Sequence, residues 1–242
     1  MSEAIIMIPA RYGSTRFPGK PLAMIAGTSL IQRVYQRARL SALASAVYVA
    51  TDDRRIAAHV EEFGGRAVMT GTEYRSGSDR IAAAVRQMGA DVAQVIDLQG
   101  DEPLVDIDAV DRMIETLRGG EADAATLCCS IGSQQEFLDR NVVKVVSDLS
   151  GRALYFSRAP IPFGDPAAAR RHVGVYGYQT ATLLAFSTLQ PSPLELSENL
   201  EQLRLLQNGF TIRVLETSEP QIGVDTPEDV ARVEDALRQR SS

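Results

Sequence analysis

A loop rich in basic side chains follows the first apolar run of the chain and is the clearest candidate for chemistry in the sequence. Residues 9–22 read PARYGSTRFPGKPL, so Arg11, Arg16 and Lys20 bring three positive charges into one loop. Gly13 and Gly19 let the backbone approach a ligand closely. Because cations of this kind bind phosphate groups well, the loop is a candidate binding site for a nucleoside triphosphate.

This loop is not a Walker A loop, which reads G-x-x-x-x-G-K-[ST] and opens directly into a helix. A solvated basic surface loop is the alternative interpretation, since several cations in one loop are common. The loop directly follows the first expected strand, residues 4–9. Open α/β sheets bind ligands at the carboxyl ends of their strands, so this position favours phosphate binding.

Two separated acids complete the candidate chemistry. Asp101 follows the apolar run VIDL, and Asp225 lies in the motif IGVDTPED. Magnesium is commonly held by one or two carboxylates together with substrate phosphates, so two acids beside a basic loop suit metal-assisted nucleotide binding. Asp225 alone is also well interpreted as an ordinary turn or helix-entry acid. Glu102 and Asp229 are candidate outer groups around the metal site.

Short β-rich runs alternate with amphipathic stretches of helical length along the chain, which is typical of a mostly parallel sheet flanked by helices. We therefore predict an α/β fold in one composite domain spanning residues 1–242. Strands are expected at residues 4–9, 46–50, 67–69, 92–98, 124–130, 141–147, 153–156, 173–178 and 211–215. Helices are expected at residues 29–40, 54–63, 78–88, 108–118, 181–189, 196–207 and 227–238.

The middle of the chain is more β-like and irregular than the rest. Two short β-rich runs flank residues 148–151, which is a hairpin-type signal, and several prolines then mark a loop. We therefore expect an inserted β-rich lobe at about residues 131–190.

The composition excludes several classes of protein. A formal net charge of −6 argues against a general nucleic-acid binder, because such proteins carry a basic face. Cys128 and Cys129 are adjacent in an apolar stretch and lack metal-ligand spacing, so we expect buried core thiols. The first apolar run is too short for a secretory signal, and no segment approaches the ~20 apolar residues that span a bilayer. These features predict a cytoplasmic protein with no membrane partner.

Nine motifs along the chain resemble one known family. From about residue 4 to residue 235 they are, in order, PARYGSTRFPGKPL, ATDD, SGSDR, LQGDEP, NVVKVV, YFSRAPIP, RHVGVYGY, PLELSENLEQLR and GVDTPEDV. Together they resemble the 3-deoxy-manno-octulosonate (Kdo) cytidylyltransferase, or CMP-Kdo synthetase, family. The resemblance implies a nucleotide-diphospho-sugar transferase fold with a smaller β-rich lobe that helps form a homodimer. The implied reaction transfers CMP from CTP to Kdo with release of pyrophosphate, a step of lipopolysaccharide biosynthesis.

The resemblance also implies a role for each candidate residue, with Mg²⁺ as the cofactor. The catalytic set is Arg11, Arg16, Lys20 and Asp101, and the metal ligands are Asp101 and Asp225. The set that binds the nucleotide comprises Pro9, Ala10, Arg11, Arg16, Lys20, Ser76 and Arg80. The set that receives the sugar acid comprises Gln99, Arg158, His172, Tyr176, Glu201 and Gln202.

The sequence departs from the commonest family pattern mainly near the acceptor-binding motifs. The loop between Pro162 and Arg171 is short, and LELSENLEQLR replaces a more usual run. The acceptor therefore stays open between Kdo, an amino-Kdo, another ulosonic acid and a phosphonate. A catalytically silent nucleotide-binding protein is an alternative from another class. An NAD-dependent oxidoreductase is disfavoured because the first loop lacks G-x-G-x-x-G.

Overall fold

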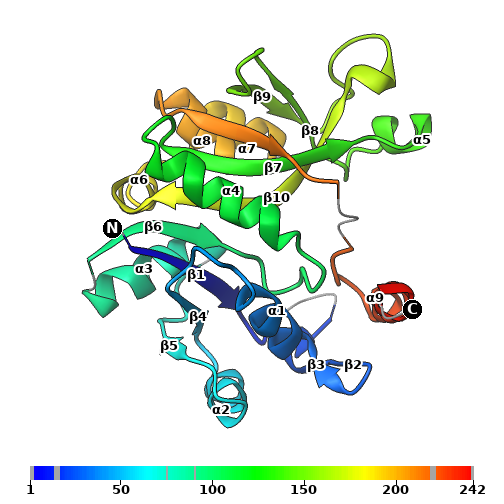
Figure 1. The fold of residues 1–242 in the computed structure, drawn as a ribbon. Coiled ribbons are helices and arrows are strands. Elements are labelled where there is room, and N and C mark those ends of the chain that lie inside the picture. Colours follow the sequence, from blue (N-terminus) through cyan, green and yellow to red (C-terminus); the bar gives the residue numbers. More distant parts are fainter. Residues whose placement is uncertain (1–2, 14–16, 75, 90, 219–221, 241–242) are drawn as a thin grey trace. The chain divides into compact units, whose positions relative to one another are not determined.

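The computed structural model describes residues 3–13, 17–74, 76–89, 91–218 and 222–240. The chain divides into two compact units (Figure 1). The first unit comprises Met1–Asp111 with Glu219–Ser242, and the second comprises Arg112–Ser218. The expected lobe at about residues 131–190 falls within the second unit, and its boundaries and role stay predictions.

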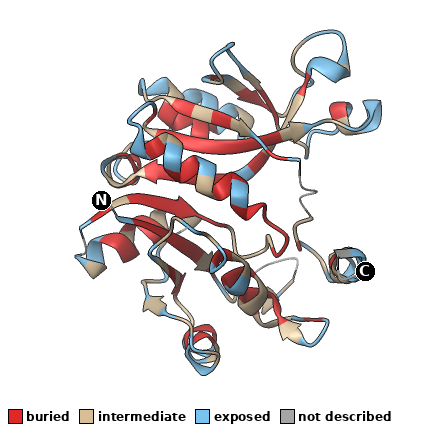
Figure 2. Cartoon of the chain, in the orientation of Figure 1, coloured by how far each residue is buried: buried red, intermediate tan, exposed pale blue. Residues whose placement is uncertain are grey.

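The first unit is built on a parallel sheet with the strand order β6–β1–β4–β5. These strands are β1 (Glu3–Ala10), β4 (Ala46–Thr51), β5 (Ala67–Met69) and β6 (Val92–Asp97). Ala4 to Ile8 of β1 are at most 2% exposed, as expected for a central parallel strand covered on both faces. Figure 2 accordingly shows β1 and β6 as mostly buried.

Three helices connect these strands, and the order of the connections determines where a ligand can bind. α1 (Leu30–Ala38) and α2 (Arg54–Glu62) lead from β1 to β4 and from β4 to β5, whereas α3 (Gly77–Met88) returns the chain to β6. Because parallel crossovers are right-handed, this reversal puts α3 on the face opposite α1 and α2. The strand order therefore changes direction between β1 and β6, and ligands of open α/β sheets bind at such switch points.

The second unit carries a mixed sheet. β7 (Ala124–Ser130) pairs parallel with β11 (Ile212–Glu216) and antiparallel with β10 (Arg170–Gln179). β8 (Lys144–Ser147) and β9 (Ala153–Ser157) form the expected hairpin, and β8 also pairs with β10. The strand predicted at 141–147 is wrong in its first three residues, which form a turn before β8.

The remaining elements are helices and short pieces. They are η1 (Lys20–Leu22), β2 (Met24–Ile25), β3 (Thr28–Ser29), α4 (Ile107–Arg118), α5 (Gln134–Leu138), η2 (Pro166–Ala168), α6 (Thr180–Phe186), α7 (Pro193–Glu198), α8 (Gln202–Gln207) and α9 (Pro227–Arg240). The helix predicted over 196–207 is wrong in its continuity, because Asn199 adopts a left-handed conformation (φ 54°) that ends α7, and α8 begins only at Gln202. Asparagine tolerates this conformation better than most residues. The predicted α/β class is confirmed.

The structure also bears on the expectations for the two cysteines and for membrane-spanning helices. Cys128 is buried, and burial raises the pKa of its thiol to about 12, whereas Cys129 is only half-buried, so the prediction of two core thiols is wrong for Cys129. Cys129 lies at the end of β7 where burial has begun to decrease. In the described part of the chain, every helix is too short or too polar to cross a membrane.

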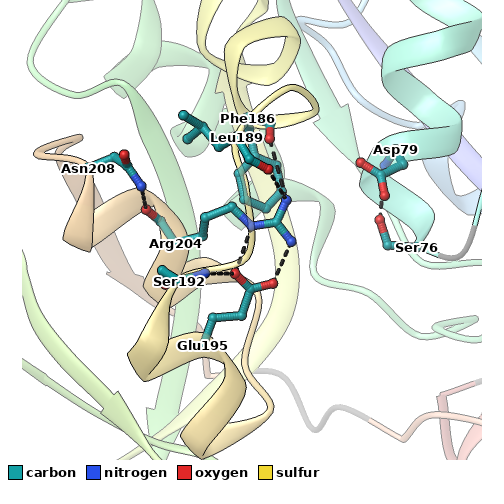
Figure 3. A network of polar contacts seen from close by, with 8 residues as sticks. All are labelled: Ser76, Asp79, Phe186, Leu189, Ser192, Glu195, Arg204 and Asn208. Carbon is teal, nitrogen blue, oxygen red and sulfur yellow. Dashed lines mark hydrogen bonds and ion pairs between the residues drawn. The ribbon is translucent and has the colours of Figure 1, made fainter.

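A buried ion pair fixes the junction of α7 and α8 that the broken helix creates (Figure 3). Arg204 donates from Nε to Glu195 Oε2 at 2.7 Å and from Nη2 to Glu195 Oε1, and its guanidinium lies 4.6 Å from the centre of the Phe186 ring. Burial alone would raise the pKa of Glu195, but hydrogen bonds from Arg204 and the Ser192 amide outweigh it and lower the pKa. The pair therefore depends on both partners being charged.

Replacing Arg204 by methionine leaves the Glu195 carboxylate buried without its partner. We expect the free energy of unfolding of R204M to fall by about 3–5 kcal/mol, as when other buried ion pairs are broken. R238M, which removes an exposed ion pair with Asp235, is the control and should cost at most about 1 kcal/mol. Urea denaturation followed by circular dichroism measures both, and an equal small loss in the two variants would contradict the assignment.

Candidate active site

A cavity of about 340 Å³ lies in the first unit at the carboxyl ends of β1 and β6. Every residue predicted to bind the nucleotide or the metal lines it, where the structure describes that residue, and so does Gln99. Arg16 lies outside the described residues. The lining consists of Pro9, Ala10, Arg11, Lys20, Pro21, Tyr74, Ser76, Gly77, Arg80, Gln99, Gly100, Asp101 and Asp225.

The Lys20 ammonium joins the two predicted metal ligands. Lys20 Nζ lies 2.7 Å from Asp101 Oδ2 and 3.5 Å from Asp225 Oδ1. Lys20 begins η1, and Gly19 before it has a φ of 72°, which a glycine adopts without strain. One cation thus contacts carboxylates that lie 124 positions apart in the sequence (225 − 101).

The backbone around Asp225 explains how this distant acid reaches Asp101. The Val224 amide donates to the Asp101 carbonyl at 2.9 Å, which ties the segment before α9 to the loop after β6. The Asp229 carboxylate accepts from the amides of Asp225 and Thr226 at 3.0 and 2.9 Å. Burial alone would raise the pKa of Asp229, but these hydrogen bonds lower it overall. Asp229 therefore orients the Asp225 turn, which fits the outer role predicted for it.

The loop after β6 approaches β1 closely. A side chain at Gly100 would lie 2.9 Å from the Pro9 carbonyl oxygen, so only glycine fits there without a shift of the backbone. Asp97 at the end of β6 is buried and accepts hydrogen bonds from Ser78 Oγ at 3.0 Å and Gln99 Nε2 at 2.6 Å. The bond to Asp97 holds Gln99 at the cavity wall.

Ser76 and Arg80 line the cavity on the side of α3. Ser76 Oγ accepts from the Asp79 amide at 3.1 Å and so caps α3 (Figure 3). The Arg80 guanidinium donates to Asp52 Oδ2 and Thr70 Oγ1, both at 2.7 Å, and is 3% exposed. Its charge is therefore paired with Asp52, and Arg80 shapes the cavity rather than supplying a free cation.

Arg11 differs from Arg80 because its side chain is exposed at the rim of the cavity. The structure gives Arg11 no carboxylate partner among the described residues. Arg11 is thus a cation at this cavity that a polyanionic ligand would meet without displacing an existing ion pair.

The residues predicted to receive a sugar acid, apart from Gln99, lie in the second unit. Arg158 follows β9 and donates from Nε to the Glu198 carbonyl at 2.8 Å and from Nη2 to the Asn199 carbonyl at 3.3 Å. These acceptors are neutral, and no carboxylate of the described chain lies within ion-pair distance of the guanidinium. Arg158 therefore keeps a positive charge available for an anion.

His172 and Tyr176 lie next to one another on β10. Their ring centres are 5.4 Å apart, and the centre of the Phe156 ring lies 5.1 Å from that of His172 in an edge-on contact. His172 Nε2 hydrogen-bonds to Thr126 Oγ1 at 3.0 Å. Burial of the ring lowers the pKa of His172 to about 3, so the imidazole is neutral at physiological pH.

Glu201 and Gln202 stand at the start of α8, which packs on β9. Glu201 is exposed, whereas Gln202 is 7% exposed. Gln202 Nε2 is buried and has no hydrogen-bond partner in the part of the chain that is described. A buried amide donor without a partner is costly, so it is well suited to a ligand hydroxyl.

Tyr74 and Glu198 are among the site residues that the sequence prediction missed. Tyr74 lines the cavity, and Glu198 accepts hydrogen bonds from Ser157 Oγ at 2.7 Å and from the Arg158 amide at 2.8 Å. Tyr74 precedes the SGSDR motif, so its proximity to Ser76 was a usable signal. Glu198 gave no signal, because the uninterrupted helix predicted over 196–207 hides the turn that brings it to Arg158.

The oxygen ligands of the cavity suit a hard divalent cation. Asp101 and Asp225 contact one ammonium, so both carboxylates face the same part of the cavity. Within the described residues no three acidic, histidine or cysteine side chains form a metal site by themselves. Magnesium is commonly bound by one or two protein carboxylates and completes its coordination with waters and substrate phosphates.

Sequence and structure comparisons agree on the class of protein. The cytidylyltransferase family profile matches residues 5–215. A solved structure of CMP:2-keto-3-deoxy-manno-octonic acid synthetase in complex with CTP is 42% identical, covers 99% of this chain and 100% of its own, and gives a TM-score of 0.92. The 4-diphosphocytidyl-2C-methyl-D-erythritol synthase of Anaerococcus prevotii shares the fold alone, at 12% identity and a TM-score of 0.63. The chain is therefore a nucleotidyltransferase in its fold and family.

Curated relatives narrow this class. The 3-deoxy-manno-octulosonate cytidylyltransferase of Geobacter metallireducens is 47% identical over 96% of both chains. The enzyme of the same name from Trichlorobacter lovleyi is 44% identical over 98% of this chain and 99% of its own. The chain belongs to the 3-deoxy-manno-octulosonate cytidylyltransferase family.

The low pKa of His172 predicts its titration. We expect the His172 ring proton resonances to stay constant from pH 8 down to about pH 4, in contrast to a free imidazole with a pKa of about 6.5. NMR measures this directly because the chain has two histidines, and H59N assigns the signals. A His172 midpoint near pH 6.5 would show that the ring is not desolvated.

The lowered pKa of His172 also determines how the free energy of unfolding changes with pH. Between pH 6.5 and about pH 3 the unfolded chain binds a proton at His172 that the folded chain does not, so the contribution to stability falls as the pH falls. H172N should remove this part of the acid sensitivity in urea denaturation at pH 7 and pH 4.5. An unchanged pH dependence in H172N would contradict the prediction.

Proposed function

We propose that the protein transfers CMP from CTP to Kdo and releases pyrophosphate. The observation that carries this proposal is the convergence of Lys20, Asp101 and Asp225 in a cavity at the switch point of a parallel sheet. The family of the chain and its 42% identity to a CTP-bound synthetase support CTP as the nucleotide. The names of the curated relatives support Kdo as the acceptor.

In the proposed reaction the anomeric hydroxyl of the sugar attacks the α-phosphorus of CTP, and the bond to pyrophosphate breaks. The obstacle is the approach of two anions. Lys20 and Arg11 neutralise the triphosphate, with Arg16 as the third cation expected from the sequence. Pro9 and Ala10, with Ser76 and Arg80, form the wall against which the cytosine lies. Holding both substrates in line supplies much of the rate acceleration.

We further propose that Asp101 and Asp225 hold Mg²⁺. When bound, the metal supplies a Lewis acid that offsets the charge of the phosphates and of the attacking oxygen. In the free protein Lys20 contacts the same two carboxylates, so a metal held by Asp101 and Asp225 would leave the Lys20 ammonium for the phosphates. The acceptor is proposed to bind through Gln99, Arg158, His172, Tyr176, Glu201 and Gln202. The use of CTP agrees with the cytoplasmic location expected from the sequence.

A pyrophosphate-release assay with CTP and magnesium tests the activity. Kdo, an amino-Kdo, another ulosonic acid and a phosphonate are the acceptors, and UTP, ATP and GTP are the control nucleotides. We expect release with CTP and Kdo in preference to every other pair. Faster release with another acceptor would keep cytidylyl transfer and overturn Kdo, whereas no release with any acceptor would favour a silent nucleotide-binding protein.

Removing either charge at the centre of the cavity should abolish most turnover. We expect K20M and D101N each to lower kcat by about 10²-fold or more, because a preorganised charge is lost from the transition state. D108N is the matched control, since Asp108 is an exposed acid on α4 that lies outside the cavity lining. Steady-state kinetics with CTP and Kdo decide the matter, and a turnover of K20M within a few fold of the native value would refute the assignment.

We propose that the protein is a homodimer that associates through the second unit. Several large apolar side chains of the expected lobe are exposed, including Leu149, Leu154 and Phe163. Phe163 is wholly exposed, which is unusual for an aromatic side chain unless a partner covers it. Polar replacement of such residues should weaken association.

The dimer proposal is tested by sedimentation velocity of L154D and F163D. We expect the native chain to sediment as a dimer and each variant to shift toward the monomer at micromolar concentration. L40D is the control, because Leu40 is similarly exposed (65%, against 59% for Leu154) but lies in the first unit. A monomeric native chain, or variants that dimerise as well as L40D, would count against the proposal.

A further inference from the structure

Lys144 is an unusual cation for this chain. Lysine and arginine together number 25, yet the sequence contains two lysines, Lys20 and Lys144. Lys20 belongs to the cavity of the first unit. Lys144, the first residue of β8, is 0% exposed. Burial lowers the pKa of its ammonium, and an ammonium is costly to bury unless each of its hydrogens has an acceptor.

Three backbone carbonyls satisfy the Lys144 ammonium. Nζ donates to Asp139 O at 2.9 Å, Val142 O at 2.6 Å and Arg158 O at 2.9 Å. An ammonium has three donors, so all are used. No carboxylate of the described chain lies within ion-pair distance of Nζ. Lys144 is thus a cross-link between the turn before β8 and the end of β9.

Arg158 contacts both of the segments that Lys144 joins. Its carbonyl accepts from Lys144, and its Nη1 donates to the carbonyl of Arg140 at 3.2 Å, inside the turn that Lys144 holds. On the other side Glu198 accepts from the Arg158 amide at 2.8 Å. The backbone of Arg158 is therefore held by Lys144 and Glu198, and its guanidinium rests on carbonyls whose positions these two residues set.

The arrangement of the three carbonyls around Lys144 Nζ suits a lysine better than an arginine. Three carbonyls converge on one atom, which matches the tetrahedral donors of an ammonium, whereas the planar fork of an arginine would direct its donors apart. This explains a lysine in a chain that otherwise uses arginine for 23 of its 25 basic side chains.

We infer that Lys144 is a positioning residue for the acceptor, which fixes the Arg158 guanidinium toward the carboxylate of the sugar acid through the carbonyls of Arg158 and Arg140. The inference rests on the proposed function, in which Arg158 binds that carboxylate. Lys144 itself does not touch the substrate. Its loss should affect acceptor binding and leave CTP binding unchanged, because the CTP cavity is lined by residues of the first unit.

Steady-state kinetics of K144M, K144Q, R158Q and K144M/R158Q with CTP and Kdo test the inference. We expect K144M to raise the KM for Kdo at least tenfold with the KM for CTP within twofold. K144Q, which keeps two donors, should show a smaller rise. The double variant should have the KM for Kdo of R158Q alone, since Lys144 acts through Arg158. A purely structural loss would instead lower kcat with the active fraction and leave both KM values unchanged.

The outcomes separate the inference from the proposed function. If R158Q raises the KM for Kdo and K144M does not, the inference is wrong and the role of Arg158 stands. If R158Q leaves this KM unchanged, the role of Arg158 fails and the inference fails with it.

A measurement on the native protein covers the case in which K144M does not fold. With lysine labelled by ¹⁵N at Nζ, two side-chain signals are expected, and K20M assigns them. We expect the Lys144 signal to show slow hydrogen exchange and to shift when Kdo alone is added, because its Arg158 acceptor adjusts. A Lys144 signal that does not change at saturating Kdo would overturn the inference.

Discussion

Two carboxylates that approach each other repel, and the Lys20 ammonium between Asp101 and Asp225 is the interaction that makes their approach favourable in the free protein. The surrounding structure serves this arrangement. The turn at Gly19 directs Lys20 into the cavity, β6 delivers Asp101, and the hydrogen bond from the Val224 amide delivers Asp225. We propose that the same three side chains hold a metal-bound triphosphate, since magnesium is commonly bound by one or two carboxylates together with substrate phosphates.

Two other charged residues near this centre have partners within the fold. Arg80 is paired with Asp52, and the Asp97 carboxylate accepts hydrogen bonds from Ser78 and Gln99. Arg11 has no carboxylate partner among the described residues, and Lys20 is paired with Asp101 and Asp225. In the second unit Arg158 has a comparable position, because it contacts carbonyls and no carboxylate among the described residues. Whether a cation has a carboxylate partner within the fold therefore determines whether it is available to an anionic ligand.

Much of the first unit could be predicted from sequence, because its apolar runs are short, continuous and separated by amphipathic helices. The phosphate loop and Asp101 follow expected strands, so their position at one edge of the sheet followed from α/β topology. Asp225 could not be placed in this way. Its approach depends on one backbone hydrogen bond to Asp101 and on the turn that Asp229 holds, neither of which leaves a periodic pattern.

The second unit shows the limits of periodicity more clearly. Apolar spacing over 196–207 continues through Asn199, yet a single left-handed residue divides the helix and turns Glu198 toward Arg158. The run NVVKVV predicted a strand from residue 141, but β8 begins only at Lys144. Residues 139–142 form a turn instead, because carbonyls of this segment accept hydrogen bonds from the Lys144 ammonium. Pairing of Arg80 with Asp52 was equally hidden, since it joins residues 28 positions apart.

If Asp101, Asp225 and Lys20 form one site for a metal-bound nucleotide, magnesium must change how tightly the protein binds CTP, and calorimetric titration of CTP with and without magnesium measures this. We expect magnesium to strengthen CTP binding at least tenfold in the native protein and D225N to lose this gain while still folding. Equal CTP affinity with and without magnesium in the native protein would show that these three side chains do not form such a site.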